Sequence, residues 1–180
     1  LQALTLVEKR ELRTALPEVR RLLETDADPS VREKSLHTLS ALGEEVDFER
    51  VVAALHDPTL RRGAMIALMR TGRLDGVIRA GEKLLSLLDS PSAIDRQTAA
   101  QVFGAVGIRN YYQPILRLMS DIDPQVRITA LAAAGKIRHP HLWAGVTEGL
   151  LHPETRGAAF EAFVEGGADS LPHIQNVVAQ

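Results

Sequence analysis

The stretch Asp28-Pro29-Ser30-Val31-Arg32 decides the fold, because the chain repeats it. Two further regular copies are Asp57-Pro58-Thr59-Leu60-Arg61 and Asp123-Pro124-Gln125-Val126-Arg127, and two irregular copies are Ser90-Pro91-Ser92-Ala93-Ile94-Asp95-Arg96 and His152-Pro153-Glu154-Thr155-Arg156. The prolines of successive copies are 29 to 33 residues apart. A period in this range is typical of a solenoid, in which each repeat is one supersecondary unit stacked on the next.

Each copy predicts the start of a helix, and the residue eleven positions past its arginine predicts the end. Aspartate is a good N-cap, and proline is tolerated in the first helical turn. Glycine is favoured just past a helix C-terminus. The residues at the five predicted ends are Gly43, Gly72, Gly107, Arg138 and Gly167. Four of these five are glycine.

Between these limits the apolar residues recur with helical spacing. The position three past each arginine is small, and it holds Ser35, Ala64, Ala99, Ala130 and Ala159. The next position holds Leu36, Met65, Ala100, Leu131 and Phe160, and the position seven past the arginine holds Leu39, Leu68, Phe103, Ala134 and Phe163. Such spacing predicts one buried face on each helix, and the small column predicts close helix approach.

A second set of helices is expected before each copy, at residues 16–24, 48–56, 78–88, 112–120 and 141–151. The sequence therefore predicts an all-α fold, an α-solenoid of helical hairpins without strands. We expect residues 1–180 to form a single array of about five helix pairs with half-repeats at both ends, 1–12 and 170–180. In the last half-repeat, Leu171, Ile174, Val177 and Val178 are expected to cap the stack. Because the chain opens on Leu1, we expect a fragment of a longer protein.

The composition excludes several classes of function. A net charge of -2 gives no basic field, so nucleic acid is not the expected partner. The absence of cysteine excludes a disulfide framework, a thiolate metal site and a cysteine nucleophile. No apolar run approaches the roughly 20 residues that span a bilayer.

The pattern Asp-Pro-x-Val-Arg, followed by alanine, leucines and a terminal glycine, resembles the HEAT repeat, in the variety also found in phycobilin lyase subunits. The resemblance covers the chain from about Leu16 to its end. It implies an armadillo-like superhelix whose surface binds other molecules. It also implies that the arginine of each copy pairs with the repeated Asp28, Asp57 and Asp123 in a ladder between adjacent repeats, although an anion-binding arginine stripe is the alternative.

No catalytic, cofactor-binding or metal-binding residue is predicted. His139, His141 and His152 lie close in sequence but lack a fourth ligand with zinc spacing, so we expect them in loops and caps. None of the histidines is followed by glutamate, as the HEAT-repeat iron hydroxylases would require. Tyr111 and Trp143 are expected to pack against neighbouring repeats, with an aromatic binding pocket as the alternative.

The candidate partner-binding residues lie one, five and nine positions past the arginines, on the row that the HEAT resemblance places on the concave face. They are Arg62, Ile66, Arg70, Gln97, Gln101, Ile128 and Lys136. A solvated face without a partner is the alternative reading of this row.

Three hypotheses for function follow. The first is a non-catalytic interaction or scaffold module that binds a protein partner or a neighbouring domain of the same chain. The stretches Val77–Leu88, Tyr112–Leu118 and His139–Trp143 resemble HEAT segments appended to bacterial carriers similar to the ATP/ADP translocases. That resemblance implies a cytoplasmic regulatory module that reaches the membrane only through a covalently linked domain.

The second hypothesis is a phycobilin lyase-like subunit, which attaches a tetrapyrrole chromophore to another protein. The third is a HEAT-like alkylpurine glycosylase, which would need a basic concave face. Glu161 and Glu165 on the predicted face disfavour it.

Overall fold

A computed structural model of the chain describes residues 1–71 and 73–173, and every regular element within them is helical. The α-helices are α1 (Gln2–Lys9), α2 (Leu16–Thr25), α3 (Pro29–Leu42), α4 (Glu45–Ala53), α5 (Arg61–Thr71), α6 (Leu74–Leu88), α7 (Ala93–Val106), α8 (Tyr112–Met119), α9 (Pro124–Ile137), α10 (Trp143–Gly149) and α11 (Arg156–Gly166). The all-α prediction is confirmed. The predicted pairs correspond to α2/α3, α4/α5, α6/α7, α8/α9 and α10/α11.

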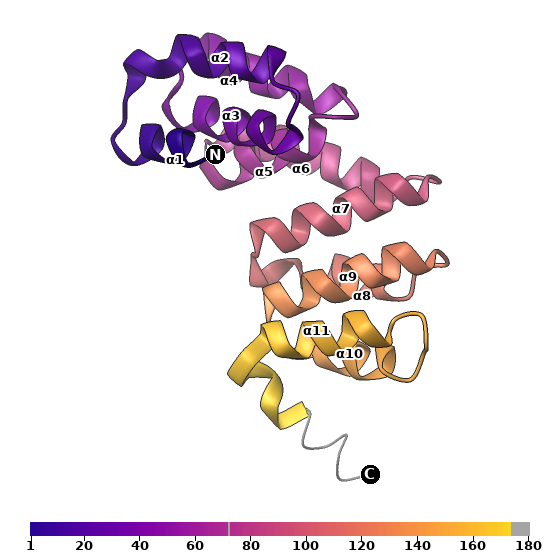
Figure 1. The fold of residues 1–180 in the computed structure, drawn as a ribbon. Coiled ribbons are helices and arrows are strands. Elements are labelled where there is room, and N and C mark those ends of the chain that lie inside the picture. The colour runs from indigo at the N-terminus through magenta and orange to yellow at the C-terminus, as the bar shows by residue number, and fades with distance from the viewer. Residues whose placement is uncertain (72, 174–180) are drawn as a thin grey trace. The chain divides into compact units, whose positions relative to one another are not determined.

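The helices form two compact units, an N-terminal unit of residues Leu1–Leu85 and a C-terminal unit that begins at Ser86. In the N-terminal unit, α3 packs beside α5, and α1 and α2 pack on α3 (Figure 1). In the C-terminal unit, α9 lies between α7 and α11, and α8 packs on α9 (Figure 1). Each unit is therefore built as a solenoid, in which consecutive repeats touch along their second helices.

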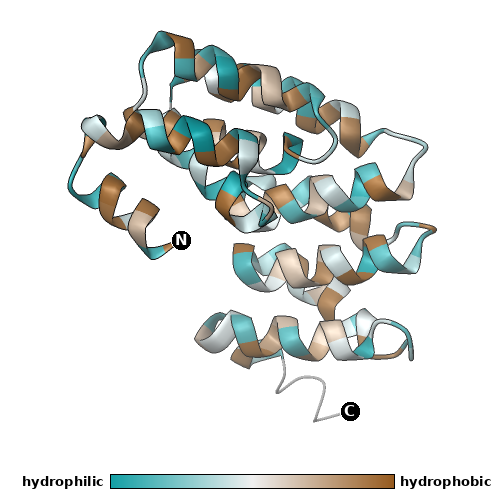
Figure 2. Ribbon diagram, turned by 45° about the horizontal axis from the view of Figure 1, so that its top comes forward, coloured by the Kyte–Doolittle hydropathy of each residue, from teal (hydrophilic) through white to brown (hydrophobic). Residues whose placement is uncertain are grey.

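The predicted apolar stripes form the core. Apolar and polar residues alternate along the helices (Figure 2), and the position seven past each arginine is buried in every copy. The alanines three past the arginine are fully buried, and the hydroxyl of Ser35 in that column donates a hydrogen bond to the carbonyl oxygen of Val31 at 2.9 Å. Phe160 corrects the prediction, because no described helix covers its face of α11 and the residue is 60% exposed.

Consecutive second helices of the C-terminal unit approach so closely that two glycines leave no room for a side chain. A Cβ atom on Gly104 would lie 2.9 Å from the Cβ of Ala133, and one on Gly135 would lie 2.8 Å from the Cα of Ala162. This close approach lies at glycines eight positions past one arginine and alanines six positions past the next, whereas the small column three positions past the arginines was its predicted place. Backbones at such a distance give dense packing between repeats.

The glycines at the helix ends serve two different purposes. Gly107 and Gly167 have positive φ angles of 69° and 57°, as predicted for a residue past a helix C-terminus. Arg138 takes the same left-handed region, with φ 54°, although it carries a Cβ atom. The predicted stop at Gly72 lies outside the described residues, as do Ile174, Val177 and Val178 of the predicted cap.

Gly43 is required for space rather than for its backbone angle, which is an ordinary φ of -70°. A Cβ atom there would lie 2.5 Å from the Cβ of Asp47. Asp47 in turn accepts the backbone N–H of Glu44 at 3.1 Å and completes a capping box at the start of α4.

A buried ion pair joins α2 to α4 in the N-terminal unit. Arg20 donates two hydrogen bonds to Asp47, at 2.6 and 2.7 Å, and the side chain of Asp47 is fully buried. These bonds lower the pKa of Asp47 below its ordinary value and outweigh the opposing effect of burial. The residues 95 positions later, Ile115 and Leu142, are both fully buried and apolar, so the C-terminal unit has no ion pair at the equivalent positions.

A second polar cluster fastens α1 to α3. The carboxylate of Glu8 contacts Lys34, accepts a hydrogen bond from the hydroxyl of Thr38 at 2.7 Å, and lies 2.9 Å from Nδ1 of His37. Burial raises the pKa of Glu8, but the bonds from Lys34, Thr38 and His37 outweigh it and lower the pKa overall. The carboxylate is thus held ionised at the junction of the two helices.

Among the helices of the described residues, none has the length and apolar character needed to cross a membrane.

We expect Asp47→Leu alone to lower the free energy of unfolding by about 3 kcal/mol, because it leaves Arg20 facing a buried position without its partner. The double variant Arg20→Ile/Asp47→Leu, which copies the apolar pair of the C-terminal unit, should recover all but about 1 kcal/mol, the share of the lost cap. Urea unfolding of the wild type, both single variants and the double variant measures this coupling. A double variant as unstable as Asp47→Leu would contradict it.

We expect Glu8→Gln to lower stability by about 2 kcal/mol at neutral pH, because charge-assisted hydrogen bonds from α3 are lost. The folded-state pKa of Glu8 lies below its unfolded value of 4.5, so this stabilisation is present above pH 4.5 and disappears as the pH falls through the folded pKa. Thermal unfolding of both proteins between pH 7 and pH 3 should therefore show a difference that shrinks toward acid. A difference independent of pH would count against the charge of Glu8 as its source.

Candidate interaction surface

The predicted partner-binding residues all lie on the second helices of their pairs. Arg62, Ile66 and Arg70 lie on α5, Gln97 and Gln101 on α7, and Ile128 and Lys136 on α9. Each unit therefore carries its own part of the row, with the α5 residues in the N-terminal unit and the others in the C-terminal unit.

In the N-terminal unit, the row opens into a cleft of about 340 Å³ between α3 and α5. The lining residues are Leu1, Ser30, Glu33, Lys34, His37, Gly63, Ile66, Ala67 and Arg70. Gly63 sets the depth of this cleft, since a Cβ atom there would lie 2.8 Å from Cγ of Glu33. Two of the predicted residues, Ile66 and Arg70, are thus brought together with polar groups of α3.

Most charges around the cleft are already paired. Arg62 binds Glu33 through Nε at 2.8 Å and through its terminal nitrogen at 2.7 Å. Lys34 and His37 are both engaged by Glu8. Arg70 is exposed and has no partner among residues 1–71 and 73–173. The cleft therefore offers one unneutralised guanidinium beside the half-buried Ile66.

In the C-terminal unit, the row is partly used for packing. Gln97 is half-buried and its amide nitrogen donates to the hydroxyl of Thr129 on α9 at 3.1 Å. Gln101 and Ile128 are half-buried, and Lys136 is exposed. Gln97 thus contributes to the contact between repeats, and Lys136 is the most accessible of the four.

The arginines of the repeat bind partners other than those expected. Each repeated aspartate accepts a backbone N–H two residues later, from Ser30, Thr59 and Gln125, all within 2.8 Å. Asp28 and Asp123 thereby cap α3 and α9, whereas the bond of Asp57 lies in the turn before α5. The prediction of direct bonds between the arginines and these carboxylates is therefore wrong. The predicted contact survives as an attraction, because the pKa of Asp57 is lowered by hydrogen bonds from Thr59 and, to a lesser extent, by the charge of Arg32 in the preceding copy. The short aspartate side chain reaches the backbone N–H two residues later, which has no partner within the helix, and accepts its hydrogen bond.

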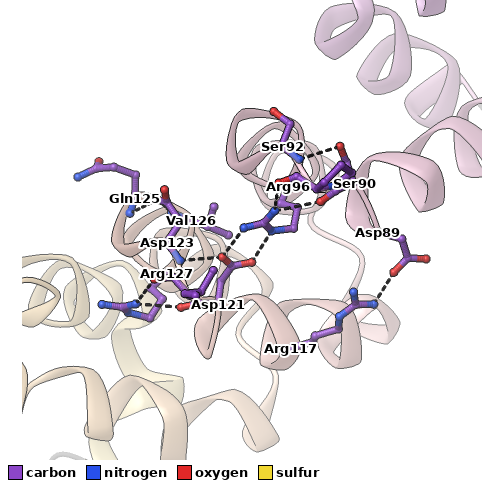
Figure 3. Close-up of polar contacts among 12 residues, drawn as sticks. Asp89, Ser90, Ser92, Arg96, Arg117, Asp121, Asp123, Gln125, Val126 and Arg127 are labelled. Atoms are coloured by element: carbon purple, nitrogen blue, oxygen red, sulfur yellow. Dashed lines mark hydrogen bonds and ion pairs between the residues drawn. The ribbon is translucent and has the colours of Figure 1, made fainter.

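A ladder between repeats does exist in the C-terminal unit, on different acids (Figure 3). Arg96 donates two hydrogen bonds to the carboxylate of Asp121, at 2.7 and 2.8 Å. It also donates to the carbonyl oxygens of Ser90 and Pro91 in the turn before its own helix. The contact with Arg96 lowers the pKa of Asp121 below its ordinary value despite burial. Each such arginine joins its own turn to the next repeat.

Arg127 combines the same two kinds of contact, and two further arginines of the column share the carbonyl contact. Arg127 binds the carbonyl oxygen of Asp121 at 2.8 Å and pairs with Glu154 in the next copy. Arg32 and Arg156 bind the carbonyl oxygens of Leu23 and Leu150, at 3.2 and 3.0 Å. These four arginines, including Arg96, satisfy carbonyls near the end of the preceding helix, so the alternative of an anion-binding stripe does not describe them.

The histidines and aromatic residues pack as structural groups. His139 stacks on Tyr112, with ring centroids 3.9 Å apart, and its ring nitrogen accepts the N–H of His141. The buried Trp143 stacks on Phe163, with centroids 5.7 Å apart. Within the described ranges no group of three or more potential ligands is arranged to hold a metal ion. Tyr112 and His139 thus fill a contact between successive pairs, whereas Trp143, which was expected to pack against a neighbouring repeat, packs on Phe163 of its own pair α10/α11.

The cluster of Glu8 with Lys34, His37 and Thr38 was not foreseen, because partners 26 to 30 residues apart carry no short-range signal. A further cleft between α8 and α10 was also missed. Its signal is present in the sequence as Gly145, which stands 95 positions after Arg50.

Comparison with known families agrees with this geometry. The family described as HEAT repeats matches residues 81–163, which run from within α6 to near the end of α11. No curated protein matches the chain. The Asp-Pro turns and paired helices of residues 16–71 follow the same plan. Residues 81–163 of this all-α solenoid are HEAT repeats.

Proposed function

We propose that the chain is a non-catalytic protein-interaction module whose α3–α5 cleft binds an acidic side chain of a partner protein. HEAT repeats generally present surfaces for protein interaction rather than catalytic groups. The single observation that carries the assignment to this cleft is the unpaired guanidinium of Arg70 at its edge.

The charge arrangement supports an acidic ligand. Glu33, Lys34 and His37 are engaged within the protein, so a second cation at the cleft would meet no free carboxylate. A carboxylate would pair with Arg70, and arginine binds carboxylates with two parallel hydrogen bonds. The half-buried Ile66 provides an apolar contact next to it. We therefore infer a partner segment that carries Asp or Glu beside an apolar residue.

The remaining predicted residues extend the proposal to the C-terminal unit. Gln101, Ile128 and Lys136 would contact a partner long enough to span several repeats, while Gln97 mainly supports packing. This extension rests on the prediction that residues 1–180 form one array.

The cellular context is a further part of the proposal and rests on resemblance alone. A module of a carrier-like membrane protein would lie in the cytoplasm and reach the membrane through a linked domain. An antibody against this chain should then detect a larger species in the membrane fraction of source cells. A species of 19.7 kDa in the soluble fraction would reject this context and leave a free-standing adaptor. The lyase-like alternative remains a prediction, which a changed bilin spectrum on mixing would support.

The cleft is tested with a phage-displayed library of random peptides selected on the full chain. Selected peptides should share an acidic residue beside an apolar one. Arg70→Glu should weaken their binding by about tenfold or more in calorimetric titrations, because attraction becomes repulsion. Arg13→Glu, at an exposed arginine of the same unit outside the cleft, is the matched control. Selected peptides that bind Arg70→Glu as tightly as wild type would overturn the proposal.

A further inference from the structure

A second cleft, in the C-terminal unit, differs in chemistry from the α3–α5 cleft. It has a volume of about 490 Å³ and lies between α8, α9 and α10. Its apolar wall comes from Leu116, Met119 and Leu131, and its floor includes Gly145. Glu148 and Glu154 lie among its polar lining. The cleft thus joins an apolar wall to a carboxylate rim.

The N-terminal unit has a cleft at the equivalent place. Arg127 stands 95 residues after Arg32, and Arg156 stands 95 residues after Arg61. Adding 95 to a residue number of the N-terminal cleft therefore gives the equivalent residue of the C-terminal cleft. The N-terminal cleft is smaller, about 330 Å³, and is lined by Arg50 and Glu24. The guanidinium of Arg50 is ion-paired with Glu24 there. In the N-terminal unit an arginine of the chain itself therefore lines the cleft and is paired with a carboxylate there.

The corresponding residues of the C-terminal unit lack that arginine. Gly145 stands in place of Arg50, and Met119 stands in place of Glu24. A Cβ atom on Gly145 would lie 2.7 Å from the methyl carbon of Met119, so the methionine has moved into part of the space that the missing side chain leaves. The rest of that space belongs to the larger cleft.

The charges of the larger cleft favour a cation. Asp121 is held by Arg96, and Glu154 by Arg127. Glu148, on α10 one turn after Gly145, is exposed and has no partner in the part of the chain that the structure describes. One unneutralised carboxylate therefore remains beside the apolar wall.

We propose that this cleft binds an arginine side chain from a segment of a partner protein. The guanidinium would pair with Glu148, and the aliphatic stem would lie against the half-buried Leu116 and Met119, since arginine buries its methylene groups along apolar surfaces. Met119 is suited to this contact because its flexible thioether can adapt to the bound chain. The Arg50–Glu24 pair of the N-terminal unit is the internal precedent for this mode of binding.

This site is separate from the α3–α5 cleft, which lies in the other unit and selects the opposite charge. The two proposals stand or fall independently, because Arg70 variants test one and Glu148 variants test the other.

The test is an NMR titration of the full chain labelled at the methionine methyl groups. The probe is the blocked peptide acetyl-Gly-Gly-Arg-Gly-Gly-amide, and the same peptide with citrulline, which is neutral and nearly isosteric, is the control. The chain has three methionines, and Met65 and Met69 lie in the N-terminal unit as internal references. We expect a saturable shift of the Met119 methyl resonance with the arginine peptide only.

Two variants sharpen the result. Glu148→Gln should weaken peptide binding by about tenfold, as expected for loss of a charge-assisted pair, whereas Glu165→Gln, at an exposed glutamate of α11, should not. Gly145→Arg should shift the Met119 resonance without peptide and abolish peptide binding, because it supplies the side chain that Arg50 supplies in the other unit. Tryptophan fluorescence of the buried Trp143 verifies that this variant is folded.

The proposal is overturned if the Met119 resonance does not move up to tens of millimolar peptide, if the citrulline peptide moves it equally, or if Glu148→Gln binds as wild type does. A folded Gly145→Arg protein that still binds the arginine peptide would overturn it as well.

Discussion

The close approach of consecutive second helices is the constraint on which the rest of the C-terminal unit depends. Gly104 faces Ala133 and Gly135 faces Ala162 at distances that admit no further atom. Because these backbones touch, the side chains on either flank are fixed in register. One flank forms the core with the first helices, and the other carries the proposed binding row, of which Gln97 is used for packing. The turn residues, the arginine contacts and the clefts are all positioned by this packing.

Much of the architecture was predictable from the sequence, because its determinants are local and repeated. The Asp-Pro turns marked the helix starts at Pro29 and Pro124, and the helical spacing marked the core. The arginine ladder was misassigned because its acids, Asp121 and Glu154, stand outside the aspartate column. Gly43 could not be interpreted from its position alone, since its role depends on Asp47 across the turn. Long-range contacts of this kind carry no sequence period.

The candidate sites were predictable only in part for the same reason. Helical spacing placed Ile66 and Arg70 on one face, but it could not show that Arg62 is neutralised by Glu33 while Arg70 is not. Which charge remains free depends on side chains of a neighbouring helix. The two units illustrate the point, since equivalent positions hold Arg20 and Asp47 in one and Ile115 and Leu142 in the other. The same backbone arrangement thus accommodates either polar or apolar side chains at equivalent positions. For this reason function can diverge between repeats.

The dual contacts of Arg96 and Arg127 have a consequence for how the protein opens. Each guanidinium is bonded to carbonyls of its own turn and to an acid of the following copy, so neither repeat can detach without breaking bonds in both. In a one-dimensional description of a repeat array, such shared bonds enlarge the coupling energy between neighbours relative to the intrinsic stability of each. Strong coupling favours unfolding as one block over fraying from an end. The C-terminal unit is therefore expected to keep its second helices stacked until the whole unit opens.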